Sequence, residues 1–206
     1  MGALKFGKLY YGWWIALTAL AINAFLSGPT YGSTGLWIDS LEKEFGWGRT
    51  QLAIAFTLGQ FESGIVGPFV GYFIDKIGPK RVAMMGVAIV ASGFLLLTQT
   101  APIGDNPSAI FSPLIFYIAF SLIMLGNTMG GFIPMMVITN NWFTRYRSLA
   151  MAVVTLGFSL GTFIIVPIMA LLISPNVLGW RNASLLVAFI AIILPILLWK
   201  VVQDEP

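Results

Sequence analysis

Six long apolar stretches, separated by short polar links, dominate the pattern of hydrophobic and polar positions along this chain. A helix that crosses the hydrocarbon core of a bilayer needs about 20 mostly apolar residues. Backbone groups in lipid can be paired only within a helix or a closed barrel. The pattern therefore predicts an all-α membrane protein with six transmembrane helices. The stretches cover residues 10–32, 51–73, 81–99, 111–138, 148–173 and 182–201.

The link over residues 34–50 is longer than most and has a helical pattern of its own. Its charged side chains alternate with Trp37, Leu41 and Phe45 at helical spacing, which favours a short amphipathic helix at the membrane surface. Residues 27–33, just before it, hold two glycines and a proline. Either the first helix ends there in a turn, or a loosened backbone faces protein or a cavity.

Small residues at four-residue spacing mark two helices on which backbones can approach closely. Positions four apart share a helix face, and small side chains on such a face favour tight packing of membrane helices. We expect close-packing seams on both helices, and we expect the uniformly apolar stretch 81–99 to pack at the periphery. The positions are Gly59, Ser63, Gly67 and Gly71 in the second stretch and Gly157 and Gly161 in the fifth.

Composition supports the bilayer as the solvent. The chain is 58% hydrophobic and 9% charged, against about 25% charged in typical soluble domains. The net charge of +3 does not indicate a nucleic-acid partner, because the basic residues lie in the links, where they set orientation. With the N-terminus inside, eight Lys and Arg residues face inward and three outward, so we expect both termini in the cytoplasm and the protein in the plasma (inner) membrane.

The residue types present exclude most enzyme chemistry. The chain has no cysteine and no histidine, so it lacks thiolate nucleophiles and the commonest metal ligand. Glu62 and Asp75 are separated by 13 residues, about 20 Å along a helix, which is farther than the roughly 5–10 Å of paired-carboxylate hydrolases. We therefore predict no catalytic residues, no metal and no cofactor.

Glu62 is the ionisable side chain that falls deepest within a predicted span. An ionised carboxylate in the bilayer is costly, and such residues mark solute or proton pathways by default. Glu62 is protonated, faces water, or pairs with a cation outside these helices; the structural alternative is a neutral Glu bonded between helices. We expect Asn23, Tyr31 and Asn127 along the same pathway, although Asn127 among glycines also fits an interhelical hydrogen bond.

One link carries a recognisable signature. The residues Gly71, Asp75, Lys76, Gly78, Lys80 and Arg81 stand between the second and third spans. This spacing resembles the cytoplasmic helix 2–3 signature of the major facilitator superfamily. Further motifs are similar to the monocarboxylate and oxalate/formate branch of that superfamily. These motifs are Tyr11-Gly12-Trp13-Trp14, Glu44-Phe45-Gly46-Trp47, Asn141-Trp142-Phe143 and Gly179-Trp180-Arg181.

The resemblance implies a secondary transporter that works by alternating access, in which two six-helix bundles rock around a central site. Its solute would be a monocarboxylate or similar organic anion, optionally with a coupling proton. Asp75 would lie against helix ends of the other bundle, where a carboxylate is stabilised by the helix dipole. Gly71 would allow close approach, and the nearby basic residues, with Arg145 and Arg147 on the helix 4–5 link, would complete the gating region.

Three departures limit what the resemblance implies. Leu122 stands where many proton-coupled relatives have an arginine, and Gly161 is followed by Thr162 where drug antiporters have proline. Residues 1–206 provide one bundle, so the C-terminal bundle is absent and would come from a missing half or a partner chain. A carrier of another solute, such as a sugar or drug, and a non-transporting six-span membrane subunit remain the alternatives.

Overall fold

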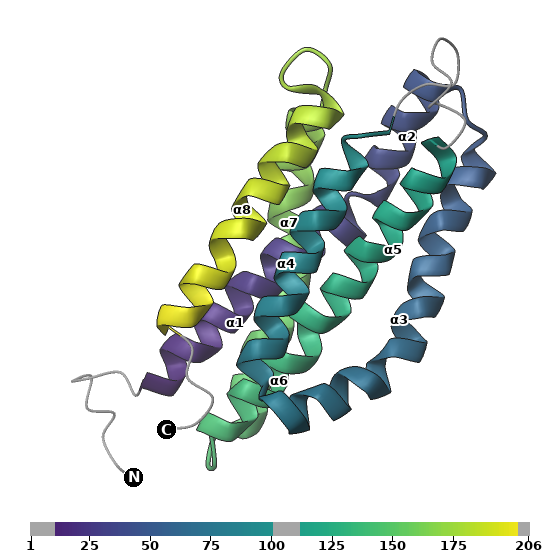
Figure 1. Ribbon diagram of the computed structural model, residues 1–206. Helices are drawn as coiled ribbons and strands as arrows, with labels where there is room; N and C mark the ends of the chain where they lie inside the picture. The colour runs from purple at the N-terminus through teal and green to yellow at the C-terminus, as the bar shows by residue number, and fades with distance from the viewer. Residues whose placement is uncertain (1–10, 101–111, 202–206) are drawn as a thin grey trace.

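The computed structural model describes residues 11–100 and 112–201, and every regular element in those two ranges is helical. The predicted all-α architecture is confirmed, and the helices form one elongated bundle (Figure 1). In chain order the elements are α1 (Tyr11–Ser27), η1 (Gly28–Gly32), α2 (Thr34–Phe45), α3 (Arg49–Ile77), α4 (Pro79–Leu97), α5 (Ser112–Gly130), α6 (Phe132–Trp142), α7 (Arg147–Ile173) and α8 (Gly179–Val201).

The first helix is longer than predicted because it continues through a π-helical turn. In η1 the amide of Ser33 donates to the carbonyl of Gly28, five residues back, at 2.9 Å, and Pro29 has no N–H to offer an ordinary helical bond. The helix goes on as α2 until Gly46, whose φ of 66° ends it in the left-handed region. The prediction of a helix end at 27–33 is wrong, and the loosened backbone is confirmed.

The short amphipathic helix predicted at residues 34–50 is confirmed as α2, but it does not lie apart from the bundle along a surface. In Figure 1, α2 runs onward in the direction of α1 and does not turn aside. Trp37 and Leu41 of α2 are buried in the main apolar core, and the Trp37 ring contacts that of Phe94 on α4 at 5.9 Å. The apolar positions of this segment therefore face the bundle, and its charged positions lie at the bundle's end.

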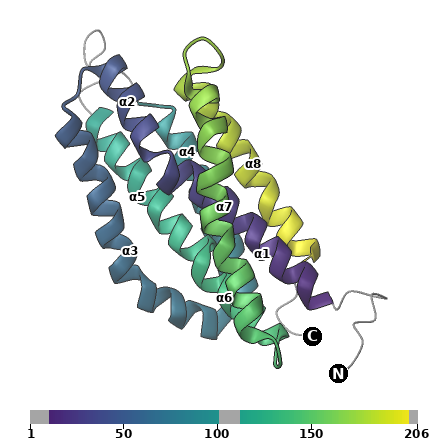
Figure 2. The same cartoon turned by 180° about the vertical axis from the view of Figure 1, so that it is seen from behind.

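Helix α4 lies in the middle of the bundle. It runs between α8 and α5 in Figure 1, and it also contacts α3 and α6. On the reverse side α7 packs along α1 (Figure 2). Val87, Val90 and Phe94 of α4 are buried in the main apolar core. The prediction that residues 81–99 pack at the periphery is therefore wrong.

Glycines explain why α4 and α5 approach so closely. A Cβ placed on Gly86 would lie 2.1 Å from the backbone nitrogen of Gly130, and one on Gly126 would lie 2.6 Å from the carbonyl oxygen of Gly86. The α1–α7 contact is similar, since a Cβ on Gly161 would lie 2.2 Å from the carbonyl oxygen of Ala24. The seam predicted on the fifth stretch is confirmed, and a second seam lies where none was predicted.

The small-residue ladder of α3 behaves differently. Gly59 packs against the Met124 side chain, but a Cβ on Gly67 or Gly71 would meet no atom within 4 Å. The neighbouring outer face of α3 carries exposed apolar side chains such as Phe61. Within this bundle, the seam predicted along the second stretch is wrong beyond Gly59.

Five described segments have the length and composition of membrane spans, and the first expected span corresponds to α1 with η1. Five segments are long and apolar enough by themselves: α3, α4, α5 with α6, α7, and α8 up to Ile196. α1 has 17 residues and continues through the five residues of η1, which together exceed the length of about 20 that a span needs. Helices α5 and α6 meet at a kink at Gly131, with Pro134 in the first turn of α6.

Candidate functional site

A cavity of about 320 Å³ lies among α1, η1, α5, α6 and α7. It brings together three of the four side chains expected along a solute pathway. Its wall is mixed, with amide and hydroxyl groups on one part and aromatic and aliphatic groups on the rest. The lining residues are Asn23, Ser27, Tyr31, Asn127, Thr128, Phe132, Ile133 and Phe158.

The first helix supplies three of these groups from one face. Asn23, Ser27 and Tyr31 are spaced four residues apart, so they line up along the helix. The Ser27 hydroxyl donates to the carbonyl of Phe158 on α7 at 3.1 Å, and the Tyr31 ring contacts the Phe158 ring at 5.6 Å. The Tyr31 and Ser63 hydroxyls are hydrogen-bonded to each other. These contacts fix the cavity wall to both α7 and α3.

Asn127 of α5 holds the π turn in place. Its Nδ2 donates to the carbonyl of Leu26 at 3.0 Å and to the Thr30 hydroxyl oxygen at 2.8 Å. From the other direction the indole Nε1 of Trp37 donates to the carbonyl of Pro29 at 2.8 Å. Side-chain donors therefore reach the carbonyls of the irregular turn. Asn127 therefore makes the interhelical hydrogen bonds that were predicted, and it also lines the cavity; its place on a solute pathway stays a prediction.

Asn23 differs from Asn127 in having no partner. Only 5% of the residue is exposed, its Nδ2 is buried without an acceptor, and its amide makes no hydrogen bond with any described residue. A buried donor without a partner costs roughly 1–3 kcal/mol. The Asn23 side chain therefore borders the cavity with a buried donor that has no acceptor among the described residues.

Glu62 is not part of the cavity wall. It is half-buried on α3, beside the packed positions Gly59 and Ser63, as the helical spacing predicted. It forms no ion pair or hydrogen bond within the described ranges. Its connection to the cavity runs through its neighbour Ser63, which bonds Tyr31. The structure therefore separates Glu62 from the other three predicted pathway residues.

The signature between the second and third spans forms a very tight link. Gly78, with φ of 89°, is the single residue between α3 and α4, and Pro79 begins α4. Asp75 and Arg81 are exposed, and neither forms an ion pair with any residue of 11–100 or 112–201. Gly71 is open, as described above. The Lys76 ammonium lies 5.8 Å from the Tyr72 ring.

Other basic residues at this end bind within the bundle. Lys80 Nζ donates to the carbonyl of Trp199 at 2.9 Å and lies 5.0 Å from the centre of its ring. Arg147 Nε donates to the carbonyl of Phe143 at 2.8 Å, and Arg145 lies over the Tyr146 ring at 5.7 Å. Lys80 therefore fixes the start of α4 to the end of α8, a role that the signature did not predict.

A polar network at the opposite end was not predicted as a site. Trp180 Nε1 and Arg181 NH1 both donate to the carboxylate of Glu44, the arginine at 2.5 Å, and Arg181 NH2 donates to the carbonyl of Thr100 at 3.1 Å. These bonds join the ends of α2, α4 and α8. The available signal was that Glu44 and Arg181, opposite charges in a chain with few charged residues, both fall in links predicted on the same side.

The fold and cavity define a class of protein before any comparison. Apolar helices long enough for a bilayer enclose a cavity with neutral hydrogen-bonding groups, and no group of three or more metal-ligating side chains occurs in the described part of the chain. Ligand sites between membrane helices lined in this way are typical of proteins that bind or move small solutes.

Comparison with known proteins gives the family. Residues 20–206 match the Major Facilitator Superfamily, and the chain belongs to it. The relatives compared below are named as transporters or antiporters.

Three curated relatives illustrate the similarity. Monocarboxylate transporter 14 of Homo sapiens is 28% identical over 85% of this chain and 32% of its own length. The oxalate:formate antiporter of Oxalobacter formigenes is 27% identical over 80% of this chain and 36% of its own length. The gallate transporter of Pseudomonas putida is 24% identical over 93% of this chain and 40% of its own length. The chain thus spans about a third of the length of these relatives.

Proposed function

We propose that this chain is the N-terminal six-helix bundle of a secondary transporter that moves a monocarboxylate or similar organic anion by alternating access. The observation that carries the proposal is the cavity, where the unpaired Asn23 amide lies on the same helix face as Tyr31. An amide and a phenol are donors suited to carboxylate oxygens. The names of the relatives, which include monocarboxylate, oxalate:formate and gallate carriers, support the same solute class.

A second six-helix bundle completes the proposed carrier. The open glycines of α3, the exposed apolar face beside them and the unpaired Asp75 all lie on one helix. In the proposed arrangement the second bundle packs against this helix and places a helix end near Asp75. It also supplies the cation for the solute's charge, because no Lys or Arg lines the cavity described here.

Glu62 is our candidate for a proton-coupling group. It lies within a span, lacks a partner among the described residues and adjoins Ser63, which bonds the cavity residue Tyr31. Ionisable residues within membrane spans mark proton or solute pathways by default. In this proposal a proton that binds and leaves Glu62 accompanies the solute.

We also infer that both termini face the cytoplasm across the plasma (inner) membrane. The start of α1, the α3–α4 and α6–α7 links and the end of α8 lie at one end of the bundle (Figure 1). That end carries Lys76, Lys80, Arg81, Arg145 and Arg147. Basic residues are enriched on the cytoplasmic side of membrane proteins.

Uptake into proteoliposomes tests the proposed function. The chain is reconstituted alone and with a second six-helix bundle expressed as a separate polypeptide, and radiolabelled lactate, formate, oxalate and gallate are supplied under a proton or an exchange gradient. We expect uptake of at least one carboxylate only when both bundles are present, and loss of that uptake in Asn23→Leu. Uptake of a labelled sugar but of no carboxylate contradicts the solute class.

Glu62→Gln tests the coupling role separately. We expect pH-driven uptake to fall while exchange of solute for solute at constant pH persists, because the variant retains the cavity but cannot release a proton. If both activities match the unsubstituted chain, Glu62 does not couple protons. Thr57→Val, at an exposed position of the same helix, is the matched control.

A further inference from the structure

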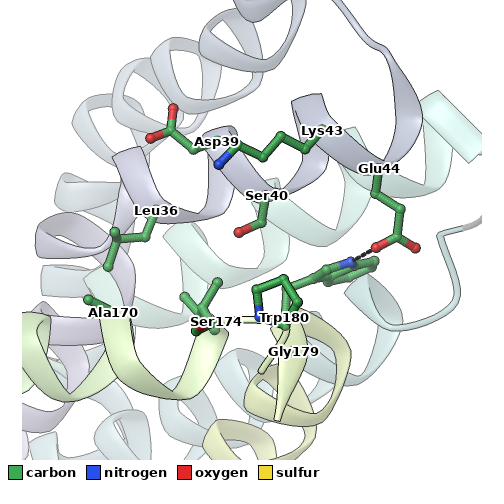
Figure 3. Close-up of a pocket in the computed structure, with 11 residues that line it drawn as sticks. Leu36, Asp39, Ser40, Lys43, Glu44, Ala170, Ser174, Gly179 and Trp180 are labelled. Carbon is green, nitrogen blue, oxygen red and sulfur yellow. Dashed lines mark hydrogen bonds between the residues drawn. The ribbon is translucent and has the colours of Figure 1, made fainter. Parts of the chain in front are cut away.

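A second pocket lies at the opposite end of the bundle from the start of α1 and the end of α8, between α2 and the link that joins α7 to α8 (Figures 1 and 3). Its volume is about 440 Å³, within the range of roughly 300–1,000 Å³ that small-molecule sites occupy. None of the described residues lines both this pocket and the central cavity. The two spaces are therefore distinct.

Both carboxylates of the pocket wall are already neutralised by partners. Asp39 pairs with Arg49 at 3.1 Å. Glu44 accepts hydrogen bonds from Trp180 and Arg181, and Figure 3 shows the indole of Trp180 turned toward it. The acidic residues of the wall thus add little net negative charge to the pocket.

The polar groups that remain without partners are all able to donate. Lys43 makes no ion pair or hydrogen bond with the described residues, and neither do the side-chain hydroxyls of Ser40 and Ser174. Ser40 and Lys43 belong to one face of α2, whereas Ser174 lies just past the end of α7. One uncompensated cation and two free hydroxyls therefore line the same space from two elements.

The rest of the wall is apolar. Leu36 of α2, Ala170 and Ile173 of α7, and the Trp180 ring lie around the polar groups. Such a wall excludes inorganic anions as the best-fitting ligands, because it would leave apolar surface against a hydrated ion. A molecule with a carboxylate at one end and an apolar body at the other satisfies both parts of the pocket.

We propose that this pocket binds a small amphipathic carboxylate, with Lys43 and the hydroxyls of Ser40 and Ser174 on the carboxylate and the Trp180 ring on the apolar body. The site is separate from the central cavity and does not require the second bundle. It concerns binding and not transport, so it stands or fails independently of the proposed function.

Equilibrium dialysis of the chain in phosphatidylcholine nanodiscs against radiolabelled benzoate tests the site. We expect saturable binding that benzyl alcohol, which has the same ring without the charge, does not displace. Lys43→Gln should weaken binding by about 5-fold or more, as expected for loss of a charge-assisted hydrogen bond, and Lys43→Arg should restore most of it. Ser40→Ala and Ser174→Ala should each weaken it about 2-fold.

A control separates the charge of Lys43 from other charges on α2. Glu42→Gln changes one charge on the same helix outside the pocket wall and should not weaken binding. Unchanged binding in Lys43→Gln overturns the proposal, and loss in Asn23→Leu with retention in Lys43→Gln assigns the binding to the central cavity. Loss of benzoate binding in nanodiscs that contain phosphatidylglycerol identifies a lipid-headgroup site and also overturns it.

Discussion

Helices α4 and α3 both carry glycines within their apolar sequences, with opposite results. A Cβ on Gly86 of α4 would lie 2.1 Å from the backbone of α5, whereas a Cβ on Gly67 or Gly71 of α3 would meet nothing within 4 Å. A partner helix of this bundle packs directly against Gly86, so we call that position closed. No atom packs against Gly67 or Gly71, so we call these positions open. Glycine spacing therefore shows where a backbone can be approached, and the partner has to be found in the structure.

The comparison also assigns the two helices different roles. The closed glycines of α4 and α7 bring backbones together and form the rigid interior around the cavity. The open glycines of α3 contribute nothing to the stability of the described bundle. In the proposed carrier these glycines contact a second bundle. That contact has to form and break as the solute site opens alternately to the two sides of the membrane.

Gly86→Ala should give the largest loss of stability. Its Cβ meets backbone atoms of Gly130, which cannot rotate away as a side chain can. We expect the free energy of unfolding in detergent to fall by about 2–3 kcal/mol, the upper part of the range for overpacking. Unfolding by sodium dodecyl sulfate, followed by circular dichroism, measures it. A loss as small as that of Gly67→Ala would remove the distinction between the two helices.

Asn127→Leu should lower the free energy of unfolding by less than Gly86→Ala does. The variant loses two hydrogen bonds to the π turn, from Nδ2 to the Leu26 carbonyl and to the Thr30 hydroxyl. The Thr30 hydroxyl still donates to Leu26, so the carbonyl keeps a partner. We expect a loss of about 1 kcal/mol, in line with interhelical hydrogen bonds in membranes, from the same unfolding measurement. Asn182→Ala, at an exposed position, is the control.

Ser27→Ala tests whether the α1–α7 seam depends on hydrogen bonding or on close approach. The variant loses the bond from Ser27 to the Phe158 carbonyl, which also accepts from Thr162. We expect a loss of about 0.5 kcal/mol, well below that of Gly161→Ala on the same seam. If the serine variant loses as much as the glycine variant, the side-chain bond and not the backbone contact stabilises this seam.

Gly67→Ala and Gly71→Ala should have the smallest effect on the bundle itself. A methyl group fits at either position, and alanine favours a helix over glycine. We expect a change in unfolding free energy within about 0.5 kcal/mol. In the proposed two-bundle carrier, uptake should nevertheless fall for Gly71→Ala, because the second backbone would approach there. Unchanged stability together with unchanged uptake would mean that nothing packs closely on this face.

Several features of the fold were predictable from residue patterns. The apolar stretches identified the spans to within a few residues, except where the first helix continued to Phe45. That continuation depends on partners far away in the sequence: Asn127 lies about a hundred residues from the turn whose Leu26 carbonyl it binds. Taken alone, a proline between glycines favours a helix end. The local sequence contains no information about the distant side chains that donate hydrogen bonds to this turn.

The candidate site was predictable in residue type but not in arrangement. Asn23, Tyr31 and Asn127 stood out as polar residues in apolar stretches, and the structure places them around one cavity. Their spacing gave no way to tell that Asn127 is paired and Asn23 is not. Glu62 falls near the middle of a predicted span, as a pathway residue would. It is the next residue, Ser63, that reaches Tyr31 of the cavity wall.

The sequence by itself determined the all-α class, the approximate bounds of the long apolar segments and the links in which charge gathers, because each depends on composition and on periodicity within one segment. Only the tertiary structure decided which glycine ladder is closed, where the cavity lies and which amide remains free. Those properties depend on the shape and donors of a second helix. A small residue on one helix permits close approach, and a backbone on another helix is required to make it.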